Sequence, residues 1–221
     1  MSASASEISD AVARLDALTR RLRRECPWDR EQDERSIVPH TVEEAFELAD
    51  AAHAGDDAKL LDELGDVLFQ VHFLSLLLEE RGAGDLAAVA EHCRQKLIRR
   101  HPHVFGDVEA ASAGEVLHNW DVIKATEAGR EHGVFGEVPE NLPALLYARK
   151  VQRRAATAGL LERAPDADPA ERGAAFERIG EQLFAAVDEA RRLRVDPELA
   201  LRAAAQRFRD RLDPEEPLGD T

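Results

Sequence analysis

Apolar residues return every three or four positions along most of the chain, and this spacing is typical of amphipathic α-helices. Capping residues, glycines and prolines set the expected ends of these helices. We expect helices over about residues 8–24, 41–54, 57–81, 86–101, from 112 onward, and 143–158. No stretch alternates between apolar and polar residues for long enough to predict a strand, so the expected fold class is all-α.

The second and third predicted helices should pack against each other as an antiparallel pair. The second begins at Thr41, which forms a capping box with Glu44, and it stops before Gly55. The third begins after Asp56 and is closed by Gly82. Because so few residues separate the two helices, they form a helical hairpin.

Two acidic motifs lie on this predicted hairpin, one on each helix. Glu44 and Glu47 share one helix face, and Glu63 and Asp66 share another, because residues three apart are surface neighbours. Four carboxylates that meet would repel, since two unit charges about 4 Å apart cost roughly 4 kcal/mol at an effective dielectric near 20. A hard divalent cation reverses that sign, and oxygen-only ligands favour Mg²⁺ or Mn²⁺ over zinc.

A helix start without any ligand also explains the first motif, because the helix dipole stabilises acids in a first turn. The second motif is harder to explain in this way, since Glu63 and Asp66 lie beside an apolar stripe that should be buried. Gly65, between them, costs about 1 kcal/mol relative to alanine in mid-helix. Close approach of a second backbone or of a ligand accounts for it, and together the two motifs favour a metal site.

The C-terminal part of the chain carries a faint copy of its middle. Glu177–Phe184 aligns with Asp62–Phe69, so that a glycine, the acid after it and a Leu-Phe pair recur in register. Arg178 replaces Glu63 in the copy, and no counterpart of Glu44 and Glu47 precedes it. Chance similarity between two helical pairs is the alternative. We expect a catalytic helical domain over residues 1–160, then a linker (161–172) and a degenerate helical repeat without metal ligands in 161–221.

Charge and cysteine content narrow the class of function. The formal net charge of −15 over 221 residues argues against binding to nucleic acid or an anionic membrane, which needs a positive field. Binding of a phosphate ligand therefore requires local positive charge, from a metal or from the basic clusters at residues 20–24 and 96–100. The alternative interpretation of each cluster is a solvated helix face. Cys26 and Cys93 make no disulfide framework, and the N-terminus lacks a secretory signal. We expect a cytoplasmic protein.

Five motifs occur in a fixed order along the chain. They are residues 26–32 (CPWDREQ), 43–47 (EEAFE), 63–70 (ELGDVLFQ), 96–105 (KLIRRHPHVF) and 120–124 (WDVIK). Together they resemble the MazG family of nucleoside triphosphate pyrophosphohydrolases over about residues 10–160. The resemblance implies an all-α bundle of the NTP pyrophosphatase type, a magnesium-dependent split of a nucleoside triphosphate into monophosphate and pyrophosphate, and a homodimer.

The resemblance also implies roles for single residues. The catalytic metal ligands are then Glu44, Glu47, Glu63 and Asp66, with Mn²⁺ as a substitute for Mg²⁺. Lys96 and Arg100, four apart on one helix face, match positions that contact the triphosphate. Trp120 and Lys124 match a nucleotide-contacting segment, and Trp28 is expected to form a pocket wall. For both tryptophans, burial in the core is the alternative reading.

His101 and His103, which follow the fourth predicted helix, suggest a metal pair at first sight. A helix break at Pro102, with Phe105 docking nearby, is the preferred interpretation. No Glu-x-x-His pair occurs at either acidic motif, which disfavours a ferritin-like di-metal bundle.

We hypothesise that magnesium ions held by the four carboxylates activate a water for in-line attack on the α-phosphorus. A narrower pyrophosphatase, for dCTP, dUTP or phosphoribosyl-ATP, is one alternative. A catalytically silent nucleotide-binding regulatory module is another. A scaffold has no physical reason to keep four clustered acids, which favours the enzyme.

Overall fold

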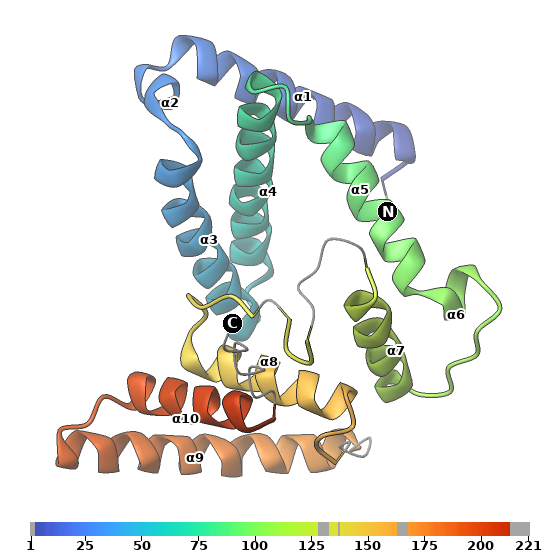
Figure 1. Cartoon of the computed structure of the whole chain (residues 1–221). Helices are drawn as coiled ribbons and strands as arrows, with labels where there is room; N and C mark the ends of the chain where they lie inside the picture. Colours follow the sequence, from blue (N-terminus) through green and yellow to red (C-terminus); the bar gives the residue numbers. More distant parts are fainter. Residues whose placement is uncertain (1–2, 128–132, 137, 163–167, 213–221) are drawn as a thin grey trace, which may run out of the picture. The chain divides into compact units, whose positions relative to one another are not determined.

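The computed structural model describes residues 3–127, 133–136, 138–162 and 168–212, and within these residues the fold is all-α, as predicted (Figure 1). The helices are α1 (Ala5–Glu25), α2 (Pro27–Glu31), α3 (Glu34–Ala54), α4 (Asp57–Glu80), α5 (Leu86–Arg100), α6 (Pro102–Phe105), α7 (Ala113–Ala125), α8 (Ala144–Thr157), α9 (Pro169–Leu193) and α10 (Pro197–Leu212). They form two compact units, residues 1–96 and 97–221, and α5 begins in the first and ends in the second. No helix in these described ranges combines the length and apolar character needed to cross a bilayer.

Several predicted helix ends are confirmed. α1 ends before Cys26, and Gly55 and Gly82 both take the left-handed φ of +68° that follows the ends of α3 and α4. The Ser112 hydroxyl accepts a hydrogen bond from the backbone N–H of Glu115 (3.2 Å) at the start of α7. These ends depend on local backbone chemistry, which is why the sequence predicts them.

The predicted start of the second helix at Thr41 is wrong. α3 begins at Glu34 because Asp33 and Ser36 cap it reciprocally: each side-chain oxygen accepts the other residue's backbone N–H, at 2.9 Å in both cases. Thr41 lies inside the helix and donates its hydroxyl to a carbonyl one turn earlier (3.3 Å). Pro39 hid the earlier start, because an interior proline removes a helix hydrogen bond and usually marks a helix boundary.

The antiparallel hairpin of α3 and α4 organises the first unit (Figure 1). Its hydrophobic core combines Ile37 of α3 with Phe73 and Leu77 of α4. These three residues lie near the open end of the hairpin, because α3 starts and α4 finishes there. The middle of α3 and the first half of α4, which carry the acidic motifs, therefore lie between this core and the connecting turn.

Helix α1 is held to the C-terminal end of α4 by two ion pairs. Arg20 Nη2 lies 2.6 Å from Glu79 Oε2, and Arg23 Nη2 lies 2.8 Å from Glu80 Oε2. Arg23 also donates to the backbone carbonyl of Gln32 (3.0 Å) just after α2. These arginines of the basic cluster at residues 20–24 therefore stabilise the packing of α1, and we do not assign them to phosphate.

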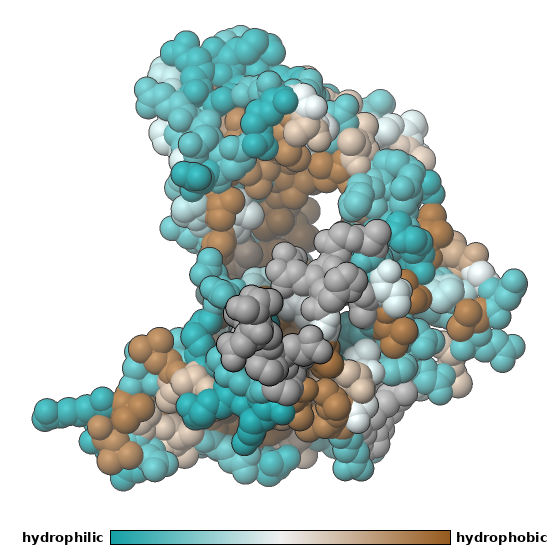
Figure 2. Space-filling view, in the orientation of Figure 1, coloured by the Kyte–Doolittle hydropathy of each residue, from teal (hydrophilic) through white to brown (hydrophobic). Residues whose placement is uncertain are grey.

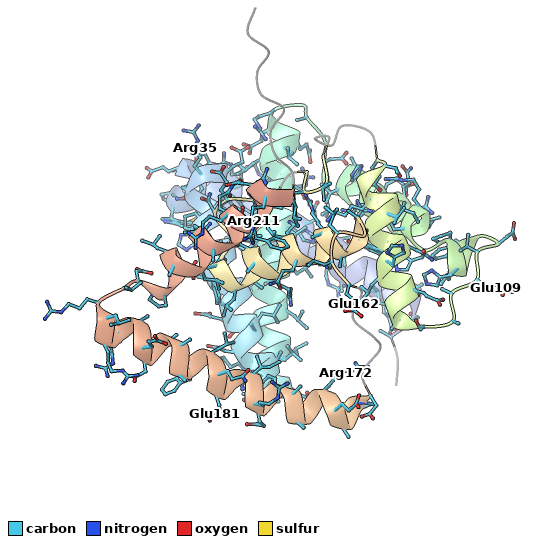
Figure 3. All side chains as sticks on the ribbon, turned by 60° about the horizontal axis from the view of Figure 1, so that its bottom comes forward. Arg35, Glu109, Glu162, Arg172, Glu181 and Arg211 are labelled. Carbon is cyan, nitrogen blue, oxygen red and sulfur yellow. The ribbon has the colours of Figure 1, made fainter. Side chains whose placement is uncertain are left out.

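Helices α4 and α9 both expose apolar side chains, and Figure 2 shows apolar surface over α4 and at the turn between α9 and α10. The exposed apolar residues of α4 are Leu61, Leu64, Leu68 and Val71. Those of α9 are Phe176, Ile179, Leu183, Phe184, Val187 and Leu193. Charged side chains such as Glu181 occupy other positions on α9 (Figure 3).

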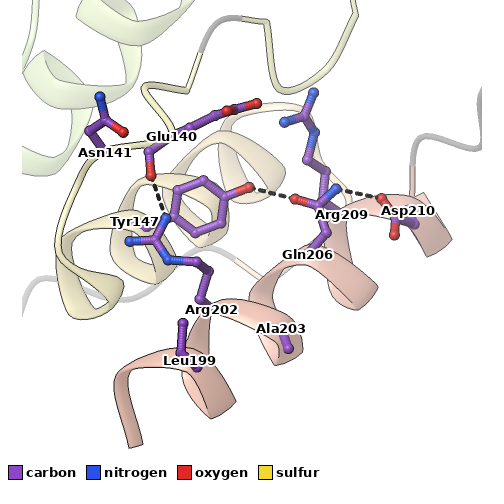
Figure 4. A pocket seen from close by; sticks show the side chains of 9 residues that line it. All are labelled: Glu140, Asn141, Tyr147, Leu199, Arg202, Ala203, Gln206, Arg209 and Asp210. Atoms are coloured by element: carbon purple, nitrogen blue, oxygen red, sulfur yellow. Dashed lines mark hydrogen bonds between the residues drawn. The ribbon is translucent and has the colours of Figure 1, made fainter. Parts of the chain in front are cut away.

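The core of the second unit lies between α8 and α10. It consists of Phe135, Val138, Tyr147, Val151, Ala155 and Ala205. The Tyr147 hydroxyl donates to Gln206 Oε1 (2.9 Å), and the guanidinium of Arg202 lies 5.6 Å from the Tyr147 ring centre (Figure 4). Arg202 also donates to the carbonyls of Glu140 and Leu142, so it holds the segment before α8 against α10.

Helix α9 begins within the predicted linker of residues 161–172. Asp168 caps it by accepting the backbone N–H of Glu171 at 2.8 Å, and Pro169 occupies the first helical position, where its missing N–H costs nothing. Residues 163–167 of the predicted linker lie outside the described residues.

Candidate functional site

Three of the predicted acidic residues come together between α3 and α4. Glu44 of α3 and Glu63 and Asp66 of α4 each offer one carboxylate oxygen, and these oxygens all lie within 4.8 Å of one another. The spacing of three residues places Glu63 and Asp66 on the same side of α4, and the antiparallel hairpin brings that side to Glu44. This group is the candidate metal centre.

The candidate metal centre is electrostatically strained in the absence of a cation. Glu63 is only 6% exposed, and its Oε2 atom is buried without a hydrogen-bond partner in the described residues. Burial, followed by the charge of Glu47, raises the pKa of Glu63, although Lys59 opposes the shift. Burial and then the charge of Asp66 raise the pKa of Glu44. A buried carboxylate oxygen without a donor, beside two more carboxylates, fits a hard divalent cation.

The fourth predicted ligand, Glu47, lies outside this group of three. It is exposed on α3, and its negative charge contributes to the raised pKa of both Glu44 and Glu63. Glu43 is also exposed, and its Oε2 atom lies 3.2 Å from His40 Nδ1. Glu47 is thus an electrostatic neighbour of the three converging carboxylates, whereas Glu43 contacts a histidine.

A pocket of about 660 Å³ lies beside the candidate metal centre, and Lys59, Gly65 and Asp66 are among the residues that line it. A Cβ atom added to Gly65 would meet no atom within 4 Å. The expected close approach of a second backbone at Gly65 is therefore absent from the described residues. The pocket leaves room for a ligand beside Gly65.

Trp28, the predicted pocket wall, lies on α2 and is half exposed. Its ring packs edge-on against His40 of α3, with centroids 5.8 Å apart and an interplanar angle of 65°. The alternative that Trp28 is a core residue is therefore wrong.

The predicted triphosphate contacts lie four residues apart on α5. Lys96 is half-buried, and Arg100 is only 4% exposed. The Arg100 guanidinium lies 5.3 Å from the ring centre of Trp120, which is half-buried on α7. Lys124 follows Trp120 by one helical turn on α7. Arg100 and Trp120 are thus brought together as neighbours within the second unit.

The prediction for the segment after α5 holds only in part. The chain breaks before Pro102 and continues as the short helix α6. The expected docking of Phe105 is wrong, because Phe105 is exposed. His101 instead packs edge-on against Trp120, with centroids 4.8 Å apart.

Glu127, which lies outside the five sequence motifs, is an ion-pair partner of the predicted triphosphate contact Arg100. It pairs with Arg100 and with Arg99, whose Nη2 atom lies 3.1 Å from Glu127 Oε1. The hydrogen bond from Arg100 holds the pKa of Glu127 down at about 2. The spacing of Trp120, Lys124 and Glu127, four and then three residues apart, is the signal in the sequence that could have revealed it.

The fold and the three converging carboxylates define an all-α protein with a candidate divalent-metal centre. Residues 32–105 match the model of a family described as the MazG nucleotide pyrophosphohydrolase domain. The nucleoside triphosphate pyrophosphohydrolase of Escherichia coli is 36% identical over 223 residues, covering 90% of this chain and 85% of that protein. The chain belongs to the MazG family.

Two further relatives match this chain at a similar identity and over similar shares of both sequences. The nucleoside triphosphate pyrophosphohydrolase/pyrophosphatase MazG of Thermotoga maritima is 38% identical, over 87% of this chain and 80% of that protein. An uncharacterised 26.1 kDa protein of Streptomyces cacaoi is 39% identical, over 93% of this chain and 81% of that protein. The similarity therefore extends well beyond the acidic motifs and includes the C-terminal helices.

Proposed function

We propose that this chain hydrolyses nucleoside triphosphates, with ribose or deoxyribose, to the nucleoside monophosphate and pyrophosphate. The observation that carries the proposal is the buried Glu63 oxygen, which has no donor among the residues that the structure describes, next to the carboxylates of Glu44 and Asp66. Such a group is costly unless a cation offsets the repulsion. The activity named for the relatives from Escherichia coli and Thermotoga maritima supports the same reaction.

We propose Mg²⁺ as the cofactor, with Mn²⁺ as a substitute. The carboxylates of Glu44, Glu63 and Asp66 would hold the cation, with Glu47 beside them. A divalent cation bound there supplies Lewis-acid chemistry and lowers the pKa of a water molecule. The protein's own contribution is to fix three anionic oxygens on two packed helices, so that little reorganisation is needed when the cation and the triphosphate arrive.

In this proposal, the other predicted site residues bind the substrate. Lys96, Arg100 and Lys124 offset negative charge on the triphosphate, and therefore on the pyrophosphate that leaves when water attacks the α-phosphorus. Trp28 and Trp120 present flat ring surfaces suited to a nucleobase. Arginine suits phosphate oxygens especially well, because its planar guanidinium donates in parallel pairs.

Product identification tests the proposed reaction. Purified protein is incubated with a panel of nucleoside triphosphates, dCTP, dUTP and phosphoribosyl-ATP, with and without MgCl₂, and the products are separated by chromatography. We expect monophosphate and pyrophosphate in equal amounts, only with the metal. Turnover of a single substrate class supports a narrower pyrophosphatase. Binding without turnover of any substrate contradicts the proposal and favours the silent regulatory module.

We also propose that the protein is a homodimer that covers the apolar residues of α4. Leu68→Glu places a charge on that surface, and Leu183→Glu makes the same change at a similarly exposed position of α9. Light scattering coupled to size-exclusion chromatography should give a dimer for the native chain and the Leu183 variant and a monomer for Leu68→Glu, because burying an unpaired charge is costly. A native chain that elutes as a monomer at all concentrations contradicts the proposal.

We also propose a functional division into a catalytic part over residues 1–160, followed by a linker and a degenerate repeat. It differs from the division into compact units, because α10 of the repeat shares a core with α8. Its support is that α9 keeps the register of α4 while Arg178 stands at the position of Glu63. A cytoplasmic location is also proposed, and the two free cysteines, Cys26 and Cys93, are consistent with a reducing compartment.

A further inference from the structure

Arg100 is held in a single orientation by two neighbours within the second unit. Its guanidinium lies over the Trp120 ring, 5.3 Å from the centre, and its Nε atom donates to Glu127 Oε1 at 3.0 Å. Its Nη2 atom donates to Glu127 Oε2. The pair is largely shielded from water, with side-chain exposures of 5% for Arg100 and 15% for Glu127. A shielded bidentate pair of this kind is stronger and more directional than a surface ion pair.

The hydrogen bonds of Arg100 show which of its N–H groups remain available to a ligand. A guanidinium carries five N–H groups, and the bonds to Glu127 use the edge formed by Nε and Nη2. Within the residues that the structure describes, Nη1 has no hydrogen-bond partner. Arg100 can therefore donate from Nη1 to a phosphate oxygen without releasing Glu127.

Glu127 has two opposing effects on an anionic ligand. Its negative charge offsets one of the positive charges of Arg99 and Arg100, which weakens attraction at long range. The two hydrogen bonds that it accepts from Arg100 restrict the rotation of that side chain, which is otherwise free to adopt many rotamers. Without Glu127, the guanidinium would be a shielded charge without its counter-ion and would turn toward water. Orientation is not screened by salt, whereas the charge effect is, so the two can be separated by experiment.

We propose that Glu127 is a positioning residue for the triphosphate. It holds Arg100 against Trp120, so that the guanidinium is already oriented when its Nη1 atom meets the phosphate oxygens. The inference rests on the proposed triphosphate contact of Arg100. Glu127 itself does not touch the substrate, and its effect on turnover passes through Arg100.

The test measures kcat and KM for the best nucleoside triphosphate in four full-length proteins: native, Glu127→Gln, Arg100→Ala and the double variant. Gln keeps the size of the side chain but can accept from only one end, so one of the two charge-assisted bonds is lost. We expect kcat/KM to fall about tenfold in Glu127→Gln, which corresponds to about 1.4 kcal/mol. In the Arg100→Ala background, the same change should alter kcat/KM by less than about twofold, because the group that Glu127 orients is gone.

Ionic strength separates orientation from charge. The loss in Glu127→Gln should persist between 0.15 M and 1 M salt, where the Debye length falls from about 8 Å to about 3 Å. Calorimetric titration with inorganic tripolyphosphate should show weaker binding by a similar factor, with unchanged affinity for Mg²⁺ alone. A purely structural role would not separate these two affinities. Glu127→Asp, which keeps the charge, should recover part of the loss.

Glu109→Gln is the matched control. Glu109 is exposed on the connection between α6 and α7 (Figure 3), so the variant changes the net charge equally at a position away from the pair of Arg100 and Glu127 in the sequence. If Arg100→Ala lowers kcat/KM while Glu127→Gln leaves it unchanged or raises it, the positioning role is overturned and the proposed function stands. If Arg100→Ala has no effect on a working enzyme, the triphosphate contact of Arg100 is wrong and the inference falls with it.

Discussion

Helices α4 and α9 carry similar sequences in register but differ in what they bury. Helix α4 buries Glu63 beside two other acids and contributes Phe73 and Leu77 to the core. Helix α9 has no buried residue, and Phe184, which aligns with Phe69, is 75% exposed. A shared pattern of glycine, acid and Leu-Phe therefore predicts a helix in both places without predicting a shared environment.

The difference arises one turn beyond the aligned motif. When the register is continued, the positions of Phe73, Leu76 and Leu77 in α4 correspond to Asp188, Arg191 and Arg192 in α9. Asp188 forms ion pairs with both arginines, at 2.7 and 3.2 Å. The apolar residues that allow α4 to pack deeply are thus replaced by charges that stay in water. Packing of the C-terminal half of α4 in the core is therefore what α9 lacks.

The largest expected effect comes from removing one aromatic ring from each helix, a buried ring from α4 and an exposed ring from α9. Phe73→Ala, at a position 1% exposed, should lower the free energy of unfolding by about 3–5 kcal/mol. Phe184→Ala should change it by less than about 0.5 kcal/mol, because the ring is already in water. Urea unfolding followed by circular dichroism checks both. A large loss for Phe184→Ala would mean that another molecule covers that face of α9.

The second prediction replaces the aligned residues Glu63 and Arg178. Glu63→Gln should lower kcat/KM by at least about 100-fold, because it removes a carboxylate from the candidate metal centre. Arg178→Gln should leave turnover within about twofold of native, since its helix carries no group of converging acids. Pyrophosphate release under saturating MgCl₂ measures both variants. Undiminished turnover in Glu63→Gln would remove the basis for the metal centre.

The third prediction concerns pH and metal. Because the pKa values of Glu44 and Glu63 are raised in the folded state, the protonated forms favour folding. Their contribution is fully present below their ordinary pKa of 4.5 and is lost as pH rises through the raised values. Metal-free protein should therefore lose stability from this group as the pH rises above 4.5. Carboxyls with a lowered pKa, such as Glu127, are already ionised in that window and should not contribute.

Adding MgCl₂ at neutral pH should reverse that loss. A ligand present at 100 times its Kd stabilises the folded state by about 2.7 kcal/mol. Urea unfolding at pH 5 and pH 7.5, with and without MgCl₂, measures both the pH effect and the metal effect. Both the pH effect and the metal effect should be smaller in Glu63→Gln than in the native chain. A native chain whose stability is indifferent to the metal would count against a bound cation.

The smallest effect is expected from the two aligned glycines. Gly65→Ala and Gly180→Ala should each stabilise the fold by about 1 kcal/mol, because both sites are helical and an added Cβ meets nothing within 4 Å. Only Gly65→Ala should lower kcat/KM, since Gly65 lines the pocket beside Asp66. Thermal unfolding and steady-state kinetics of the two variants check this. Equal kinetics in both would mean that no ligand approaches Gly65.

The predictions that held were those based on local chemistry. Gly55 and Gly82 closed their helices because a left-handed φ is easiest for glycine. The predicted helix start at Thr41 was wrong because the sequence holds two capping signals, and the helix begins after the earlier one, at Asp33, despite Pro39. The docking of Phe105 failed because an apolar side chain next to a helix break does not by itself indicate what it contacts.

The sequence by itself determined that the chain is helical, that α3 and α4 form a hairpin, and that each carries a pair of acids on one face. Helical periodicity, capping and the shortness of the connection are properties of neighbouring residues, so they can be read along the chain. Only the tertiary structure decided that Glu63 is buried with an oxygen that lacks a donor within the described ranges, that Glu47 stays outside the converging group, and that Arg100 is paired with Glu127. These facts depend on how distant segments pack, and packing follows the shape and volume of all the contacting side chains rather than the spacing of any motif.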